Sequence, residues 1–185
     1  GTASVNLTLD IQNAVFVDGG WLAAGSGTAN DPYNTIKAAV DAANRSGDAI
    51  VVADGVYKSL KNGGKEDFGE NGITLTRSTS IHGGYAGWDS GTSFDWAKRV
   101  PRSTDIDLTG ANARALYANV DNITLTVDGL TIRNGTAANG GGAIKMEHKN
   151  SANLNLANCL FTDNTTTAED GGAVVFIADS GAIPC

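Results

Sequence analysis

The sequence predicts an all-β protein, a right-handed parallel β-helix (solenoid) with one N-terminal capping α-helix. Three observations support this fold class: short strand-like segments separated by turns rich in Gly and Asn, a single helical pattern near the start, and an internal repeat. The 185 residues fit one structural domain. We divide it into an N-terminal strand or extension at 1–13, a cap with the helix at 14–48, and β-helix coils at 49–185.

The first predicted element is a strand that precedes the cap. Residues 4–11 alternate strictly between polar and apolar, which is typical of a half-buried strand. The apolar face of this strand carries Val5, Leu7, Leu9 and Ile11. Because the strand has no obvious position in the coils, we expect it to pair with a neighbour's open end, as in strand donation.

One helix is predicted after the loop that contains Pro32. The apolar residues Ile36, Ala39, Val40 and Ala43 fall at i, i+3, i+4 and i+7, which places them on one face of a helix. Asn34 is the expected N-cap, with Asp31 as a competing choice. Gly47 is expected to end the helix.

The repeat determines the expected architecture. Apolar positions recur 29 residues later, and an Asn and a Gly-Gly-Ala element recur 30 residues later. The matched pairs are Val127 with Leu156, Leu130 with Cys159, Ile132 with Phe161, Asn134 with Asn164, and Gly141-Gly142-Ala143 with Gly171-Gly172-Ala173. Strands this short cannot bury a face alone, whereas stacked coils share a continuous core. A β-sandwich would instead require hairpin turns at regular spacing.

Two kinds of turn residue in the repeat have expected roles. The repeated asparagines, Asn134 and Asn164, are predicted to lie at a bend and to stack as a ladder. The repeated Gly-Gly pairs are predicted to let the chain turn sharply where a side chain would clash.

The N-terminal part resembles the cap of pectin-lyase-like β-helix proteins, and the resemblance covers about residues 14–57. Its elements are Val15-Phe16-Val17-Asp18, Gly25-Ser26-Gly27-Thr28, Asn30-Asp31-Pro32-Tyr33-Asn34-Thr35-Ile36, Ala39-Val40, Ala43, Gly47-Asp48-Ala49-Ile50 and Gly55-Val56-Tyr57. The resemblance implies that the helix plugs the open end of the coil and that the following strand begins the first rung.

Further elements resemble large bacterial secreted β-helix proteins and polymorphic outer-membrane proteins. These elements are Ile81-His82-Gly83-Gly84-Tyr85-Ala86-Gly87, Asp105-Ile106-Asp107-Leu108-Thr109-Gly110, Gly141-Gly142-Ala143-Ile144 and the pair Phe161 and Asn164. Those relatives are mostly surface-displayed or autotransported proteins with adhesive or unknown roles. The resemblance therefore implies a secreted, extracellular or outer-surface location.

Composition excludes several classes of partner. The net charge of −7 and the lack of Lys or Arg runs argue against nucleic-acid binding. No apolar run approaches the roughly 20 residues of a membrane span. The opening Gly1-Thr2-Ala3 lacks a signal-peptide pattern, so the chain is expected to be a mature or trimmed product. A surface of Asn, Thr, Ser, Asp and Gly is typical of extracellular β proteins.

An enzymatic reading has little support from the residues. Asp105 and Asp107 would share one face of a strand, and Lys98, Arg99 and Arg102 lie nearby in sequence. This arrangement is the basis of a weaker alternative, a polysaccharide lyase or glycoside hydrolase that acts on acidic glycans. Solvated charge is the favoured reading of this pair. Neither His82 nor His148 has metal-ligand spacing, so we expect no metal, no cofactor and no catalytic residues.

Carbohydrate binding is a third alternative, based on aromatic residues in the long segment 83–102. Tyr85, Trp88, Phe94 and Trp96 could stack on sugar rings, or they could fold the segment onto the body.

The two cysteines leave three readings open. Cys159 and Cys185 could form a disulfide, Cys159 could be a buried thiol, and Cys185 could bond to another chain.

The leading functional prediction is a non-catalytic structural or adhesive protein that works in an assembly. The chain has an N-terminal cap but no recognisable C-terminal one, so the last coil is expected to expose strand edges that pair with another chain. The expected contact residues are Val174 and Phe176 on the last coil and the apolar face of residues 4–11. Such a head-to-tail contact between copies would propagate into filaments.

Overall fold

The computed structural model describes residues 14–43, 48–87, 95–148, 150–168 and 171–178. Within these ranges the chain forms mainly β-strands and a single α-helix, α1 (Ile36–Ala42), with one short 3₁₀ helix at Leu60–Asn62. The predicted all-β class is therefore confirmed. The predicted strand at residues 4–11, with Val5, Leu7, Leu9 and Ile11, lies outside the described residues.

Most strands belong to three sheets in which neighbours run parallel, here called sheets A, B and C. Sheet A has the order β1 (Ala14–Val17), β2 (Ala49–Ala53), β5 (Thr79–Ala86), β9 (Ile123–Asp128) and β13 (Ala152–Ala157). Sheet B has the order β3 (Gly55–Lys58), β7 (Thr104–Asp107), β10 (Leu130–Arg133) and β14 (Leu160–Thr162). Sheet C has the order β4 (Ile73–Leu75), β8 (Leu116–Asn119), β12 (Ile144–His148) and β16 (Val174–Ala178).

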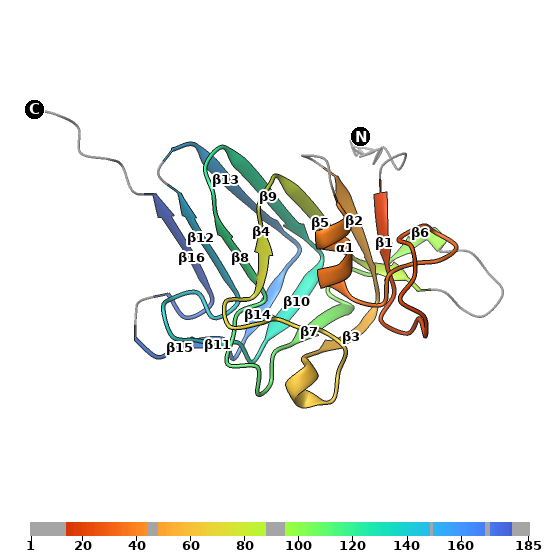
Figure 1. Ribbon diagram of the computed structural model, residues 1–185, viewed down its shortest axis with the longest axis horizontal. Helices are drawn as coiled ribbons and strands as arrows, with labels where there is room; N and C mark the ends of the chain where they lie inside the picture. The colour runs from red at the N-terminus through yellow and green to blue at the C-terminus, as the bar shows by residue number, and fades with distance from the viewer. Residues whose placement is uncertain (1–13, 44–47, 88–94, 149, 169–170, 179–185) are drawn as a thin grey trace, which may run out of the picture.

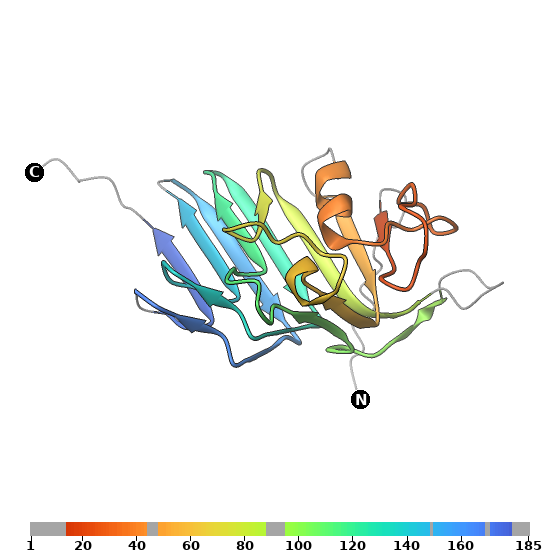
Figure 2. The same cartoon turned by 60° about the horizontal axis from the view of Figure 1, so that its bottom comes forward.

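Two smaller pairings complete the topology. The strand β6 (Asp95–Arg99) runs antiparallel to β5 beside sheet A. The short strands β11 (Thr136–Ala137) and β15 (Thr165–Thr166) pair in parallel between sheets B and C. Figures 1 and 2 show the strands following one another along the long axis, from β1 near one end to β16 at the other.

The internal sequence repeat matches the register in which the strands pair. The chain passes through sheets A, B and C as β9, β10 and β12, and then again as β13, β14 and β16. Val127 pairs with Leu156, Ile132 with Phe161, and Ile144 with Val174. The apolar residues that match in sequence therefore lie directly over one another, as the predicted stacking requires. We call each passage through the three sheets a layer.

The core lies between the three sheets. Alternate residues of β9 are buried, because every second side chain of a strand points to the same face. The largest fully buried side chains come from all three sheets, from α1 and from the residue after β7; they are Ile36, Ile50, Ile73, Leu75, Ile81, Ile106, Leu108, Leu116, Leu125, Leu130, Ile132 and Ile144.

Helix α1 covers the end of this core that lies next to the N-terminal strands β1 and β2. Ile36 and Ala39 are buried, and the helix contacts β1, β2 and β4 (Figure 1). The N-cap is Thr35, whose Oγ1 accepts a hydrogen bond from the Ala38 N–H at 3.2 Å. The predicted caps Asn34 and Asp31 are therefore wrong, since Thr35 is the last residue with extended backbone.

The structure refines both predictions about turns. Gly141 has a φ of 61°, and a Cβ there would lie 2.4 Å from the Ile144 carbonyl oxygen, so the predicted clash is confirmed. Asn164 donates to the Ile132 carbonyl at 2.8 Å, whereas Asn134 donates to Asp107 Oδ1 at 3.0 Å. Each asparagine thus bonds to the preceding layer through different groups, in place of the predicted uniform ladder.

Candidate functional site

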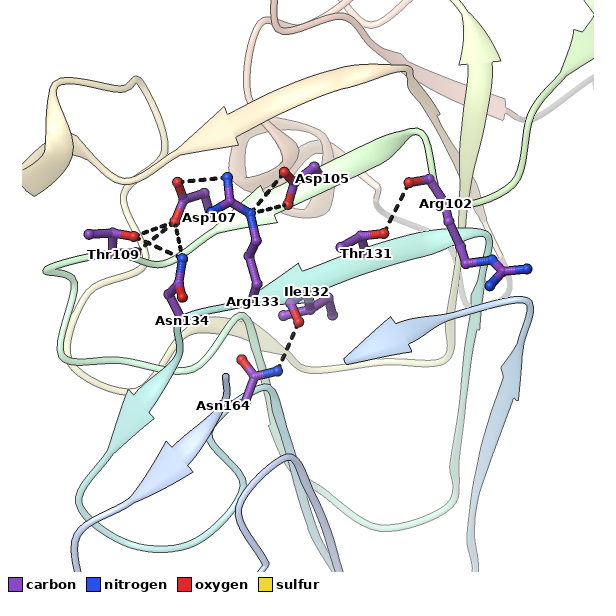
Figure 3. Close-up of polar contacts among 9 residues, drawn as sticks. All are labelled: Arg102, Asp105, Asp107, Thr109, Thr131, Ile132, Arg133, Asn134 and Asn164. Carbon is purple, nitrogen blue, oxygen red and sulfur yellow. Dashed lines mark hydrogen bonds and ion pairs between the residues drawn. The ribbon is translucent and has the colours of Figure 1, made fainter. Parts of the chain in front are cut away.

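The two carboxylates considered as a weaker, catalytic alternative lie on the outer face of sheet B. Asp105 and Asp107 flank Ile106 on β7, and Ile106 is buried in the core. Arg133 on the neighbouring strand β10 reaches both carboxylates (Figure 3). Its Nε lies 2.9 Å from Asp105 Oδ2, and its Nη2 lies 3.0 Å from Asp107 Oδ2. One guanidinium therefore joins two carboxylates and ties β10 to β7.

Further hydrogen bonds engage Asp107. Its Oδ1 accepts from the Thr109 hydroxyl at 2.6 Å, from the Thr109 N–H at 3.0 Å and from Asn134 Nδ2 at 3.0 Å. Burial alone would raise the pKa of this carboxyl, but the hydrogen bonds and the Arg133 charge outweigh it and lower the pKa. A carboxylate so fully bonded is suited to holding layers together rather than to acid–base catalysis.

Replacing Asp107 with Asn is expected to destabilise the protein at neutral pH and to matter less in acid. Because its pKa is lowered, the carboxylate stabilises the fold above the pKa of the unfolded chain, and this contribution is lost as the pH falls through the folded-state pKa. Urea unfolding should show a deficit of about 1–3 kcal/mol for the variant at neutral pH, shrinking at lower pH. An equal deficit at both pH values, or one matched by the exposed control Asp67→Asn, would contradict this role.

Of the four aromatic candidates, Tyr85 is the one whose side chain the structure describes. It is 9 % exposed and packs with Phe16, Val51 and Ala53 on the outer face of sheet A. Tyr85 is therefore a packing residue, which was the second of the two readings. Trp88 and Phe94 lie outside the described residues. Trp96 lies in β6, but its side chain is also outside the description.

Cys159 lies in the last layer and is half-buried. Its thiol donates to the carbonyl oxygens of Val127 at 3.4 Å and Ala157 at 3.2 Å. Burial raises the pKa of this thiol, which disfavours the reactive thiolate. Cys185 lies outside the described residues, so the three readings of the two cysteines stay open.

Register brings together two polar clusters that the sequence analysis did not find. On sheet A, Asp128 lies between His82 and Arg99. On sheet C, Glu147 accepts from the Tyr117 hydroxyl at 2.7 Å and lies 2.9 Å from the Lys145 ammonium. The repeat spacing could have revealed the second cluster, because Tyr117 and Glu147 are 30 positions apart and lie in adjacent layers.

The last layer differs from the others in exposure. Strands β13, β14 and β16 each pair with one neighbour among the described residues. Phe176 is 43 % exposed and Leu156 is 39 % exposed, whereas Met146 and Val127, which lie over them one layer earlier, are 0 % exposed. We call the inward side chains of this layer the end face; they are Leu154, Leu156, Cys159, Phe161, Val174 and Phe176.

The described residues contain no group of three or more His, Cys, Asp or Glu placed to hold a metal ion. Within the same residues, no helix has both the length and the apolar character needed to cross a membrane. Comparison with protein-family models, with curated proteins and with solved structures gives no match. The class that the structure itself defines is an all-β protein of parallel sheets with one α-helix.

Proposed function

We propose that this chain is a right-handed parallel β-helix that acts as a non-catalytic structural or adhesive protein, secreted or displayed on an outer cell surface. The passage of the chain through three parallel sheets in constant order supports the solenoid. The turn-rich, weakly charged composition supports the extracellular location. Coils stacked in register form a rigid rod, and a rigid rod suits a structural role.

The end face is the observation that carries the proposal. Its inward side chains are apolar and half-buried or, at Leu156 and Phe176, exposed, although equivalent side chains one layer earlier are fully buried. The edges of β13, β14 and β16 offer backbone hydrogen-bonding groups beside them. An apolar face beside strand edges that have no second neighbour among the described residues favours a further strand as its partner, through β-augmentation.

The proposed partner of the end face is residues 4–11 of a second copy. That segment alternates strictly, so a strand there would present Val5, Leu7, Leu9 and Ile11 on one face. One apolar face is what an edge strand such as β16 needs to extend the core beyond Val174 and Phe176. Because donor and acceptor lie on different parts of the chain, the contact is heterologous and adds copies head to tail.

Light scattering after size-exclusion chromatography of the full chain tests this assembly. We expect particle mass to rise with protein concentration, and we expect Phe176→Lys and Leu9→Lys to abolish that rise. The matched controls are Asn155→Lys, an exposed outward residue of the last layer, and Thr8→Lys, on the polar face of the donor segment. Circular dichroism would verify that each variant folds. A wild-type protein that stays monomeric, or variants that assemble like their controls, would overturn the proposal.

A further inference from the structure

A cluster of buried ionisable side chains, independent of the proposed assembly, lies on the outer face of sheet A. Strand register places Phe16, Val51, His82 and Asp128 in one row across β1, β2, β5 and β9. The first two residues of the row are apolar and the last two are ionisable. His82 is 8 % exposed and Asp128 is 9 % exposed, so both titratable groups are shielded from water.

One carboxylate serves three partners from three parts of the chain. Asp128 Oδ2 lies 2.9 Å from Arg99 Nη2 and 3.6 Å from His82 Nδ1. Asp128 Oδ1 accepts a hydrogen bond from Asn158 Nδ2 at 2.9 Å. The charged groups that act on His82 are therefore Asp128 from β9 and Arg99 from β6.

Arg99 fastens β6 to sheet A. The strand pairs with β5 at Tyr85↔Arg99 and Ala86↔Asp95, with an irregularity between them. The Arg99 side chain adds a hydrogen bond from Nε to the Gly83 carbonyl at 2.9 Å, the ion pair with Asp128, and a stack 5.2 Å over the Tyr85 ring. Because the ladder is so short, the Arg99 side chain is an important part of the attachment of β6.

A proton on His82 would change the balance of charge around Asp128. Neutral His82 leaves one carboxylate paired with one cation, whereas protonated His82 places two cations beside that carboxylate in a poorly hydrated position. Burial lowers the pKa of His82 and the Arg99 charge lowers it further, against the opposing effect of Asp128. If β6 moves away from sheet A, water reaches His82 and the Arg99 charge leaves it, so the pKa of His82 rises. Acid therefore favours the form in which β6 is detached.

We propose that His82, Asp128 and Arg99 form an acid-sensitive latch that holds β6 on sheet A at neutral pH and releases it when His82 takes up a proton. Release removes the Arg99 guanidinium from the Tyr85 ring. It thereby uncovers the Tyr85 ring, which packs with Phe16, Val51 and Ala53. The latch gives the surface of this protein a second, more apolar state in mildly acidic surroundings.

Hydrogen exchange of the full chain at about pH 7.5 and about pH 5, corrected for intrinsic rates, tests the latch across the range in which histidine titrates. The reporter is the Val100 amide, which donates to the Gly84 carbonyl next to β6. We expect its protection to be lost at the lower pH, while the Leu125 amide in β9 stays protected as the internal reference for global folding.

Two variants separate the latch from a general acid effect. His82→Gln, which cannot be protonated, should keep Val100 protected at both pH values. Asp128→Asn, which removes the shared carboxylate, should leave Val100 unprotected at both, again with Leu125 protected. A wild-type protein whose Val100 protection does not change with pH, a His82→Gln variant that responds like wild type, or an Asp128→Asn variant that stays latched would each overturn the proposal.

Discussion

Replacing Gly142 with alanine is expected to lower the free energy of unfolding by about 3 kcal/mol, at the upper end of the usual cost of overpacking. A Cβ on this residue would lie 2.5 Å from the Thr165 carbonyl oxygen and 2.6 Å from the Gly172 carbonyl oxygen. Both are backbone atoms of the next layer, so no side-chain rotation can relieve the contact. The Gly142 N–H also donates to Gly172 at 2.7 Å, and separating the layers would break this bond.

The repeat supplies a matched control for this substitution. Gly172 occupies the equivalent position one layer later, and a Cβ there would meet the Asn164 carbonyl oxygen at 3.1 Å. Neither glycine has a positive φ, so the two substitutions differ in contact rather than in backbone strain. Urea unfolding should therefore show a much smaller loss for Gly172→Ala. Equal losses at the two positions, or a loss below about 0.5 kcal/mol at Gly142, would contradict the packing argument.

The features that the sequence predicted correctly are those that a regular spacing of residues encodes. The stripe of Ile36, Ala39, Val40 and Ala43 gave the position of α1, because one face of a helix recurs every 3.6 residues. The offset of 29 between Ile132 and Phe161 gave the stacking of the last two layers. Neither inference needed knowledge of which distant residues touch.

The earlier layers do not show the same sequence period, because insertions of different length separate their strands. In sheet B, β7 pairs with β10 at an offset of 26 (Thr104↔Leu130), and β3 pairs with β7 at an offset of 49 (Gly55↔Thr104). The segment between β3 and β7 includes β6 and the 3₁₀ helix, which add chain without adding a layer to the three sheets. A search for one fixed period cannot detect layers spaced so unevenly.

The same cause explains why the ion partner of Asp105 and Asp107 could not be predicted. The basic residues close to Asp105 and Asp107 in sequence are Lys98, Arg99 and Arg102, and the sequence pointed to these. Register brings Arg133 beside both carboxylates because β10 pairs with β7. The role of an outward polar residue in stacked layers is thus decided by the residue one layer away, which is known only once the register is known.

The second large effect concerns the attachment of the cap helix, and it should appear as a dependence of stability on pH. Glu66 is 1 % exposed, and its carboxylate accepts the N–H groups of Ile36 at 2.5 Å and Lys37 at 3.3 Å. These are the first two residues of α1, whose early N–H groups have no partner within the helix. A loop residue 30 positions away thereby ties the cap helix to the body.

Glu66 opposes folding most strongly above neutral pH. Burial raises its pKa from 4.5 to about 7, even though the two backbone hydrogen bonds and the charge of Lys37 act to lower it. Below about pH 4.5 the group is protonated in both the folded and the unfolded protein, so it adds no pH dependence. Between about pH 4.5 and 7 the unfolded chain loses its proton first, which favours unfolding by an amount that reaches about 3 kcal/mol.

Glu66→Gln is therefore expected to remove a decline of about 3 kcal/mol in the free energy of unfolding between about pH 4.5 and pH 7.5. The neutral amide can accept one of the two N–H groups but opposes the other, and this cost does not vary with pH. Urea unfolding across the pH range separates the two effects, since the first changes the slope and the second only the offset. The exposed Glu70→Gln on the same loop should change stability by less than about 0.5 kcal/mol. If wild type and Glu66→Gln declined in parallel, the cap helix would be held by its apolar face, Ile36 and Ala39, and the buried carboxylate would have no part in its pH response.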